Sequence, residues 1–80
     1  METLLEPEVK VLHDIGNHLR YLRKQLGMSQ EELAYAAGFS RSYYSDVETG
    51  KRNVSILTLY KLSIVFDIPL NDLLNIRKEC

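Results

Sequence analysis

The chain has 80 residues, of which 45% are hydrophobic and 26% charged, the composition of one small globular domain rather than of a disordered chain. Its single cysteine, Cys80, excludes an internal disulfide and a cysteine-based zinc site. Its hydrophobic runs are shorter than the roughly 18 residues that a membrane span needs. Glu2 and Glu6 stand where a secretory signal would carry lysines, so we expect a cytoplasmic protein with no membrane association.

The net charge of −1 hides an uneven distribution along the chain. The segment from Ile15 to Lys61 holds seven basic and four acidic residues, whereas the two ends together hold three basic and seven acidic residues. A basic middle between acidic flanks leaves a nucleic-acid partner open in spite of the neutral total.

The first predicted element is an amphipathic helix. Hydrophobic residues recur every three or four positions from Leu12 to Leu26, and Gly27 is the expected stop. Pro7 allows this helix to begin as early as Glu8, because proline is tolerated in a first turn.

Two short helices follow. Ser29 and Glu32 form a capping box that opens the second helix, which we expect to end near Ala37 because a glycine follows. Ser40 caps a third helix that runs to about Thr49, where another glycine supplies the stop.

The last two predicted helices lie in the C-terminal third. Ser55 caps a fourth helix that runs through Phe66. Pro69 sets the first turn of a fifth helix that fades after Ile76. Five short helices with short connections predict a compact all-α domain.

The second and third helices carry the signature of a helix-turn-helix over residues 30–49. Two short helices that cross steeply need small residues where they touch. Ala34 stands one turn before Gly38, and glycine adopts a positive φ in the turn without strain. The predicted core between the pair consists of Leu33, Ala37, Tyr44 and Val47.

At these residues the chain resembles the phage repressor/Cro-type (XRE) helix-turn-helix family. The likeness covers residues 15–76, which the resemblance identifies as the domain proper, with residues 1–14 as an N-terminal extension and the start of the first helix. One departure is Tyr44, where the family usually places isoleucine or valine. We expect its hydroxyl to reach the edge of the core for a partner. The matching segments are Ile15-Gly16, Leu19-Arg20, Leu22-Arg23, Leu26 to Ala34, Gly38-Phe39-Ser40, Tyr43-Tyr44-Ser45, Val47-Glu48, Gly50-Lys51-Arg52, Leu59, Leu62 and Leu73-Leu74.

The resemblance implies that the third helix lies in the major groove of double-stranded DNA with its N-terminal residues at base edges. This places Arg41 and Ser42 first and Asp46 one turn further along. Arg41 fits guanine O6 and N7 with its two-pronged guanidinium, although a phosphate contact is the alternative. For Asp46 three roles stay open: accepting from cytosine N4, orienting Arg41, or repelling a wrong approach of the DNA backbone.

Contacts to the DNA phosphates are expected on both sides of that helix. The N-terminus of the second helix favours an anion through its free N–H groups and its dipole. If Tyr44 points inward, Tyr43 faces the DNA backbone, because neighbouring helical residues point about 100° apart. An ordinary solvated turn is the alternative for Lys51 and Arg52. The expected phosphate contacts are Gln30, Ser40, Tyr43, Lys51, Arg52 and Asn53.

Two further pairs have roles in the family. Arg23 and Glu48 match a structural ion pair that joins the first helix to the end of the third. Glu31 and Glu32 match positions at which some repressors of this type touch RNA polymerase. Helix capping and favourable interaction with the helix dipole are the plainer explanation for both acids.

The fourth helix predicts a homodimer because it is hydrophobic on two stripes. Ile56, Leu59, Leu62 and Phe66 are expected to face the core, and one stripe is enough for a core. The second stripe therefore needs cover, either from a second copy of the chain or from Leu4, Leu5, Val9 and Val11 folded back over it. The expected dimer interface consists of Leu57, Tyr60, Ile64, Val65 and Ile68.

Other functions fit less well. His13 and His18 lie five residues apart, the wrong spacing for two ligands on one helical face, and Cys80 has no persuasive histidine partner. We therefore expect no enzyme, no metal and no cofactor, and we expect His18 on the surface. Size and the segment from Arg41 to Asn53 resemble the controller proteins of restriction–modification systems. A phage-type repressor and an antitoxin-like regulator that acts through protein partners are the alternatives.

Overall fold

The computed structural model describes residues 6–75, and all regular structure within that range is helical. This agrees with the all-α expectation. None of the helices in the described range has the length and hydrophobicity needed to cross a membrane. The helices are α1 (Glu6–Gln25), α2 (Gln30–Ala37), α3 (Arg41–Glu48), α4 (Ile56–Phe66) and α5 (Leu70–Leu73).

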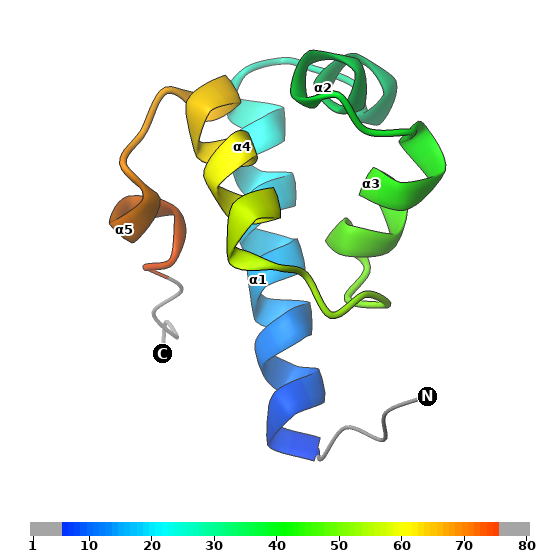
Figure 1. Ribbon diagram of the computed structural model, residues 1–80, viewed down its shortest axis with the longest axis vertical. Helices are drawn as coiled ribbons and strands as arrows, with labels where there is room; N and C mark the ends of the chain where they lie inside the picture. Colours follow the sequence, from blue (N-terminus) through cyan, green and yellow to red (C-terminus); the bar gives the residue numbers. More distant parts are fainter. Residues whose placement is uncertain (1–5, 76–80) are drawn as a thin grey trace.

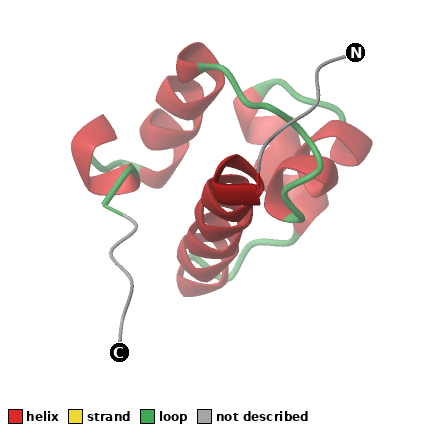
Figure 2. Cartoon of the chain, turned by 90° about the horizontal axis from the view of Figure 1, so that it is seen from below, coloured by secondary structure: helices red, strands yellow, loops and turns green. Residues whose placement is uncertain are grey.

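The long helix α1 runs through the molecule, and the four shorter helices pack around its C-terminal half (Figure 1). Seen from below, α2 and α3 lie on one side of α1, and α4 and α5 lie on the other (Figure 2). The first turns of α1 project beyond the other helices (Figure 1). The helix-turn-helix unit therefore forms one flank of the molecule and α4–α5 the opposite flank.

The capping residues form the contacts that the sequence predicts. The Ser29 hydroxyl accepts from the backbone N–H of Glu32 at 3.0 Å, and the Glu32 carboxylate accepts from the N–H of Ser29 at 2.8 Å. Ser40 and Ser55 cap α3 and α4 through the first of these two bonds, their hydroxyls accepting from the backbone N–H groups of Tyr43 and Thr58. These bonds satisfy backbone donors that have no partner within the helix.

Two helix ends differ from the prediction. The first helix begins at Glu6 rather than Glu8, with Pro7 inside its first turn. The third ends at Glu48 with Thr49 as its C-cap, which agrees with the predicted end near Thr49. The fifth has a single turn that ends at Leu73, and the predicted end at Ile76 lies outside the described residues.

Gly38 makes the turn between α2 and α3. Its φ of 81° lies in the left-handed region, which costs glycine little and other residues more. The N–H of Phe39 donates to the carbonyl of Ala34 at 2.8 Å and closes the end of α2. The predicted steep crossing of the two helices depends on this turn.

The core lies between the two flanks and confirms most of the predicted inward positions. Ile56 is an exception: its side chain is 56% exposed at the very start of α4, before the helix reaches the core. Leu26 is also exposed, because α1 ends one residue before it. The buried hydrophobic residues are Ile15, Leu19, Leu33, Ala34, Tyr44, Val47, Leu59, Leu62, Phe66 and Leu73.

Gly16 sets the distance between α1 and α3. A Cβ built on it would lie 2.2 Å from the carbonyl oxygen of Glu48 and 2.8 Å from that of Val47. Only a residue without a side chain allows the two backbones to come this close. This role of Gly16 was not predictable from the sequence, because the contact is between residues far apart in the chain.

Two buried polar atoms contradict the sequence expectations. The Tyr44 hydroxyl does not reach the edge of the core: the side chain is fully buried, and within residues 6–75 its oxygen has no partner in hydrogen-bonding geometry. His18 is half-buried rather than on the surface, and its Nε2 is likewise shielded and unpaired within that range. The Tyr44 ring therefore fills the core, and its hydroxyl is enclosed there.

Candidate nucleic-acid interface

The N-terminal turn of α3 presents polar side chains to solvent. Arg41 and Ser42, the first two residues of the helix, are both exposed. Ser40, which precedes them, uses its hydroxyl to cap the helix. The opposite face of the same helix is buried through Tyr44 and Val47. Packing against the core therefore holds α3, and with it the exposed first turn, in position.

Glu48 anchors the C-terminal end of α3. Its buried carboxylate accepts from Arg23 Nε at 2.6 Å and Nη2 at 3.2 Å, and from the Gln30 amide at 2.9 Å. Arg20 Nε lies 3.6 Å from the same carboxylate. Arg23 also donates to the Met28 carbonyl at 2.9 Å. The structure thus brings Arg23 and Glu48 together, and it adds Gln30 and Arg20 to the pair, so one side chain joins α1, α2 and α3.

These contacts determine the protonation state of Glu48. Burial alone would raise the pKa of this carboxyl, but the hydrogen bonds from Arg23 and Gln30 outweigh it and hold the pKa below its usual value. Burial, together with the neighbouring Glu48 carboxylate, raises the pKa of the Tyr44 phenol far above its usual value. The cluster therefore contains an ionised carboxylate and a neutral phenol at neutral pH.

Tyr43 points along the side of α3 toward α4. Its hydroxyl and that of Thr58 share a hydrogen bond of 3.2 Å, and its ring meets the Phe39 ring edge-on with centroids 5.2 Å apart. Tyr43 is half-buried. Its ring therefore connects α3 to α4, and its hydroxyl already has a partner inside the protein.

Asp46 and Arg52, assigned separately from the sequence, lie together. Arg52 Nε is 3.4 Å from Asp46 Oδ2. The Arg52 guanidinium also lies over the Tyr43 ring, 5.1 Å from its centroid, a distance at which a cation and a ring attract. Asp46 therefore contacts Arg52, whereas no bond between Asp46 and Arg41 occurs among the described contacts.

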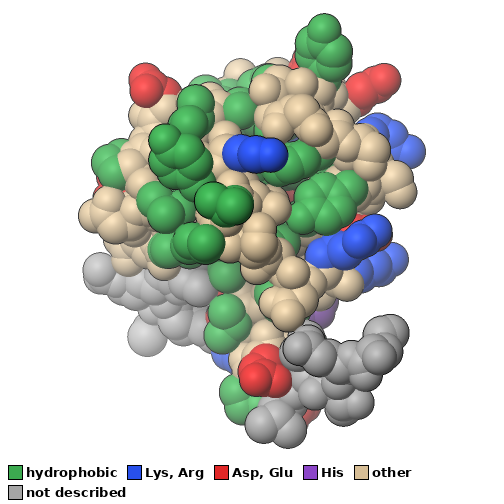
Figure 3. All heavy atoms as spheres, in the orientation of Figure 1, with side chains coloured by type: hydrophobic (Ala, Val, Ile, Leu, Met, Phe, Trp, Pro, Cys, Tyr) green, Lys and Arg blue, Asp and Glu red, His purple; other side chains and the backbone are tan. Residues whose placement is uncertain are grey.

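The remaining expected phosphate contacts lie around the same flank. Lys51 and Asn53 are exposed in the loop after α3, and the Gln30 side chain is directed inward to Glu48. On the face shown in Figure 3, most Lys and Arg side chains gather over α3 and the loop that follows it. Hydrophobic side chains spread over the α4 side (Figure 3).

Lys61, on α4, is a basic residue that was not among the expected DNA contacts. Its Nζ lies over the Phe39 ring, 5.8 Å from the centroid. The sequence separates the two residues by 22 positions, and no local pattern links them. Only the packing of α4 against the α2–α3 turn brings them together.

Glu31 and Glu32 have different surroundings in the first turn of α2. Glu32 closes the capping box. Glu31 is exposed and takes no part in that box. Capping thus accounts for one of the two acids, and the helix dipole for both.

The outward face of α4 is hydrophobic. Leu57, Tyr60 and Ile64 are 67%, 52% and 60% exposed, whereas Val65 and Ile68 pack against the core and are only partly accessible. The alternative cover is not in place within residues 6–75, because Val9 and Val11 are themselves exposed on α1; Leu4 and Leu5 lie outside the described residues.

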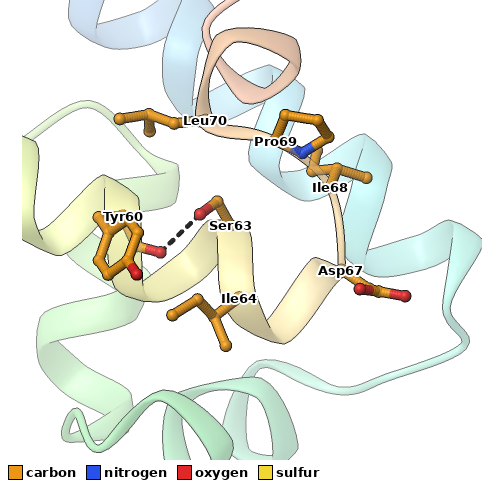
Figure 4. Close-up of a pocket in the computed structure, with 7 residues that line it drawn as sticks. All are labelled: Tyr60, Ser63, Ile64, Asp67, Ile68, Pro69 and Leu70. Carbon is orange, nitrogen blue, oxygen red and sulfur yellow. Dashed lines mark hydrogen bonds between the residues drawn. The ribbon is translucent and has the colours of Figure 1, made fainter.

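A shallow groove of about 440 Å³ separates the end of α4 from the start of α5. Figure 4 shows Tyr60 and Ile64 on one side of it and Pro69 and Leu70 on the other. At its floor the buried Ser63 hydroxyl donates to the Tyr60 carbonyl at 2.6 Å (Figure 4). The groove continues the hydrophobic face of α4.

Comparison with known proteins decides the family. The helix-turn-helix family matches residues 19–73. The chain belongs to the helix-turn-helix family. The control protein C.MunI of a Mycoplasma species is 46% identical over 66 residues, which cover 80% of this chain and 89% of that protein. The resemblance inferred from the sequence is confirmed.

Solved structures of family members have the same fold. The restriction-modification controller protein C.AhdI from Aeromonas hydrophila matches with a TM-score of 0.78 at 43% identity, over 81% of this chain and 94% of that one. SinR, a master regulator for biofilm formation crystallised in complex with DNA, matches with a TM-score of 0.71 at 40% identity, over 76% of this chain and 98% of that one. These helix-turn-helix relatives are regulators and controller proteins.

Proposed function

We propose that this helix-turn-helix protein is a sequence-specific transcriptional regulator that binds operator half-sites in double-stranded DNA as a homodimer. The observation that carries the proposal is the geometry of α3. Arg41 and Ser42 stand exposed on its first turn, while Glu48 at its other end is bonded to both α1 and α2. A helix held in this way can enter the major groove and present its N-terminal side chains to base edges without first becoming ordered.

The DNA backbone is bound from both ends of the helix-turn-helix. The Gln30 amide is occupied by Glu48, so the contact at the start of α2 is made by backbone N–H groups and the helix dipole. Lys51 and Asn53 contact phosphates from the loop after α3. These contacts position the protein, whereas Arg41 supplies sequence preference through guanine O6 and N7.

Dimerisation follows from the uncovered face of α4. Leu57, Tyr60 and Ile64 form a hydrophobic surface on a small domain, and such a surface is usually covered by a partner. A two-fold axis at this face covers it with the same residues of a second copy. It also provides two recognition helices, which read half-sites about one turn of DNA apart.

Within the family, the protein acts as an autoregulatory controller of a restriction–modification system. Its likeness to C.MunI and C.AhdI along most of both chains supports this assignment. A phage-type repressor and an antitoxin-like regulator are the competing assignments. A methyltransferase gene and an endonuclease gene beside this gene are the expected finding, and their absence would contradict the controller assignment.

Titration of the protein on the DNA upstream of its own gene, at two salt concentrations, tests regulation at that site. We expect specific binding whose affinity falls steeply with salt, because phosphate contacts release counterions. Equal binding to unrelated DNA of the same length would contradict the proposal.

The exposed Glu31 extends the proposal to RNA polymerase. A Glu31→Lys variant that binds operator DNA normally but no longer activates transcription would support that contact. Normal activation by the variant would contradict that contact, and the interaction of Glu31 with the α2 dipole would then be its role.

A further inference from the structure

The loop after α3 returns Arg52 to the surface of the helix that it has just left. Gly50 has a φ of 75°, and the N–H of Lys51 donates to the carbonyl of Asp46 at 2.9 Å. The α-helix thus ends with a glycine in the left-handed region of φ and ψ, a common way for a helix to end. As a result, a side chain six residues beyond Asp46 lies beside it.

The Arg52 guanidinium is held on two sides. Its Nε is 3.4 Å from Asp46 Oδ2, and its central carbon is 5.1 Å from the centroid of the Tyr43 ring. The ring is itself fixed, through its contact with Phe39 at 5.2 Å and its hydroxyl bond to Thr58 at 3.2 Å. Even so, the Arg52 side chain is 52% exposed. Arg52 is therefore positioned before any ligand arrives, yet it is accessible to one.

The position of Asp46 decides which ligand fits. A phosphate bound to Arg52 would bring a full negative charge close to the Asp46 carboxylate, and like charges at such distances repel. Guanine O6 and N7 are acceptors without a net charge and meet much less repulsion. Arg52 also lies against residues 43 and 46 of the helix that is proposed to enter the major groove. The site therefore favours a base edge over the DNA backbone.

The hydrogen-bonding groups of Arg52 agree with this. Its Nε is directed at Asp46, which leaves the N–H groups of both Nη atoms for an outside acceptor. Those two nitrogens can donate together to guanine O6 and N7. We propose that Arg52 reads a second guanine in the major groove, and that Asp46 is a positioning residue that holds Arg52 for this contact and does not itself touch a base. The proposal rests on the DNA binding proposed above.

The test compares affinities for a duplex selected by the unaltered protein from randomised DNA and for every single-base-pair change of that duplex. Arg52→Ala and Arg52→Lys should each lose preference at one base pair by roughly 5- to 150-fold, with the salt dependence unchanged. Lysine keeps the positive charge but lacks the two neighbouring N–H donors that pair with guanine O6 and N7. Asp46→Ala should weaken preference at the same base pair, and Asp46→Asn, which keeps an acceptor, should restore part of it.

Two controls separate this role from a general effect. Asp14→Ala removes a carboxylate that is also paired with a cation, Lys10 at 3.2 Å, but lies on α1, and it should leave every preference unchanged. The double variant of Asp46 and Arg52 should be no worse than Arg52→Ala alone, because Asp46 acts through Arg52.

Three results would overturn the inference. Equal weakening on all sequences by Arg52→Ala, with a salt slope lower by about one, would make Arg52 a phosphate contact. If Asp46→Ala lowers base preference as much in the Arg52→Ala protein as in the unaltered protein, Asp46 contacts a base directly. If the unaltered protein binds specifically and Arg52→Ala and Asp46→Ala keep its base preferences, the inference alone is wrong. If the unaltered protein enriches no sequence, the proposed function is wrong as well.

Discussion

Glu48 is a carboxylate that belongs to α3 but is bonded to α1 and α2. Its side chain has no exposed surface, and that of Arg23 is 11% exposed. Removing one partner of such a pair leaves the other as an uncompensated buried charge. The residue therefore fixes the position of α3 relative to α1 and α2.

Glu48→Ala should lower the free energy of unfolding by about 3–5 kcal/mol and leave base preference in the remaining folded protein unchanged. Thermal melting measures the first effect and binding to duplexes with single changes measures the second. The control is Asp14→Ala at the exposed Lys10–Asp14 pair, for which the cost should stay below about 1 kcal/mol. An unchanged melting temperature for Glu48→Ala would contradict the role of this cluster.

The lowered pKa of Glu48 makes stability depend on pH in one direction. The unfolded chain titrates near the ordinary value of 4.5, and the folded chain titrates lower, so protons bind the unfolded state preferentially. This contribution to stability should be complete at neutral pH and should be lost as the pH falls below about 4.5 toward the lowered pKa. Urea unfolding at a series of pH values measures the slope, which Glu48→Gln should reduce. If the free energy of unfolding of the variant depends on pH as steeply as that of the native protein, other carboxylates cause the dependence.

Arg41 is the residue that the proposed function depends on for base preference. Arg41→Ala should cost about 1–3 kcal/mol in binding to the selected operator and relax preference at one base pair. Competition between operators that differ at single positions measures this effect. An equal loss on every sequence would reduce Arg41 to a phosphate contact.

At the scale of the helices, the close approach of α1 and α3 depends on Gly16. A methyl group there would lie 2.2 Å from the Glu48 carbonyl oxygen, so two backbones would have to separate. Gly16→Ala should therefore destabilise the fold by about 1–3 kcal/mol or more, as overpacked cores do, although alanine is the better helix former. Asn17→Ala, at the exposed neighbouring position, is the control and should not destabilise. A variant of Gly16 as stable as the native protein would show that the helices can move apart freely.

The helices also show how far the sequence alone reaches. The caps at Ser29, Ser40 and Ser55 were predictable, because a capping bond joins residues three positions apart. The closeness of Asp46 and Arg52 was not, since it depends on the direction of a loop. The exposed Ile56 was mispredicted from spacing alone, which does not show where the core begins along a helix. Buried positions in the middle of helices, such as Leu33, followed from the pattern.

At the scale of the molecule, the net charge of −1 does not describe either flank. Basic side chains gather over α3 and its following loop, and hydrophobic side chains gather over α4 (Figure 3). The first flank suits phosphates, and the second suits a copy of the same surface. The resemblance to a known family anticipated this division of roles, whereas the sequence pattern placed Val65 on α4 and Ile68 just after it more fully on the outer face than the structure does.

The proposed dimer should depend on the hydrophobic face of α4. Ile64→Glu places a charge on this face and should convert the protein from a dimer to a monomer in sedimentation experiments at micromolar concentrations. Tyr35→Glu is the matched control, because Tyr35 is 88% exposed but lies on α2, and it should leave assembly unchanged. A native protein that sediments as a monomer at high micromolar concentration would contradict the dimer.

Selection of binding sites from a randomised duplex library tests whether two copies of α3 read DNA together. We expect two enriched half-sites related by two-fold symmetry, with centres about 10 base pairs apart. No enriched sequence, or a single half-site without a symmetric mate, would contradict it.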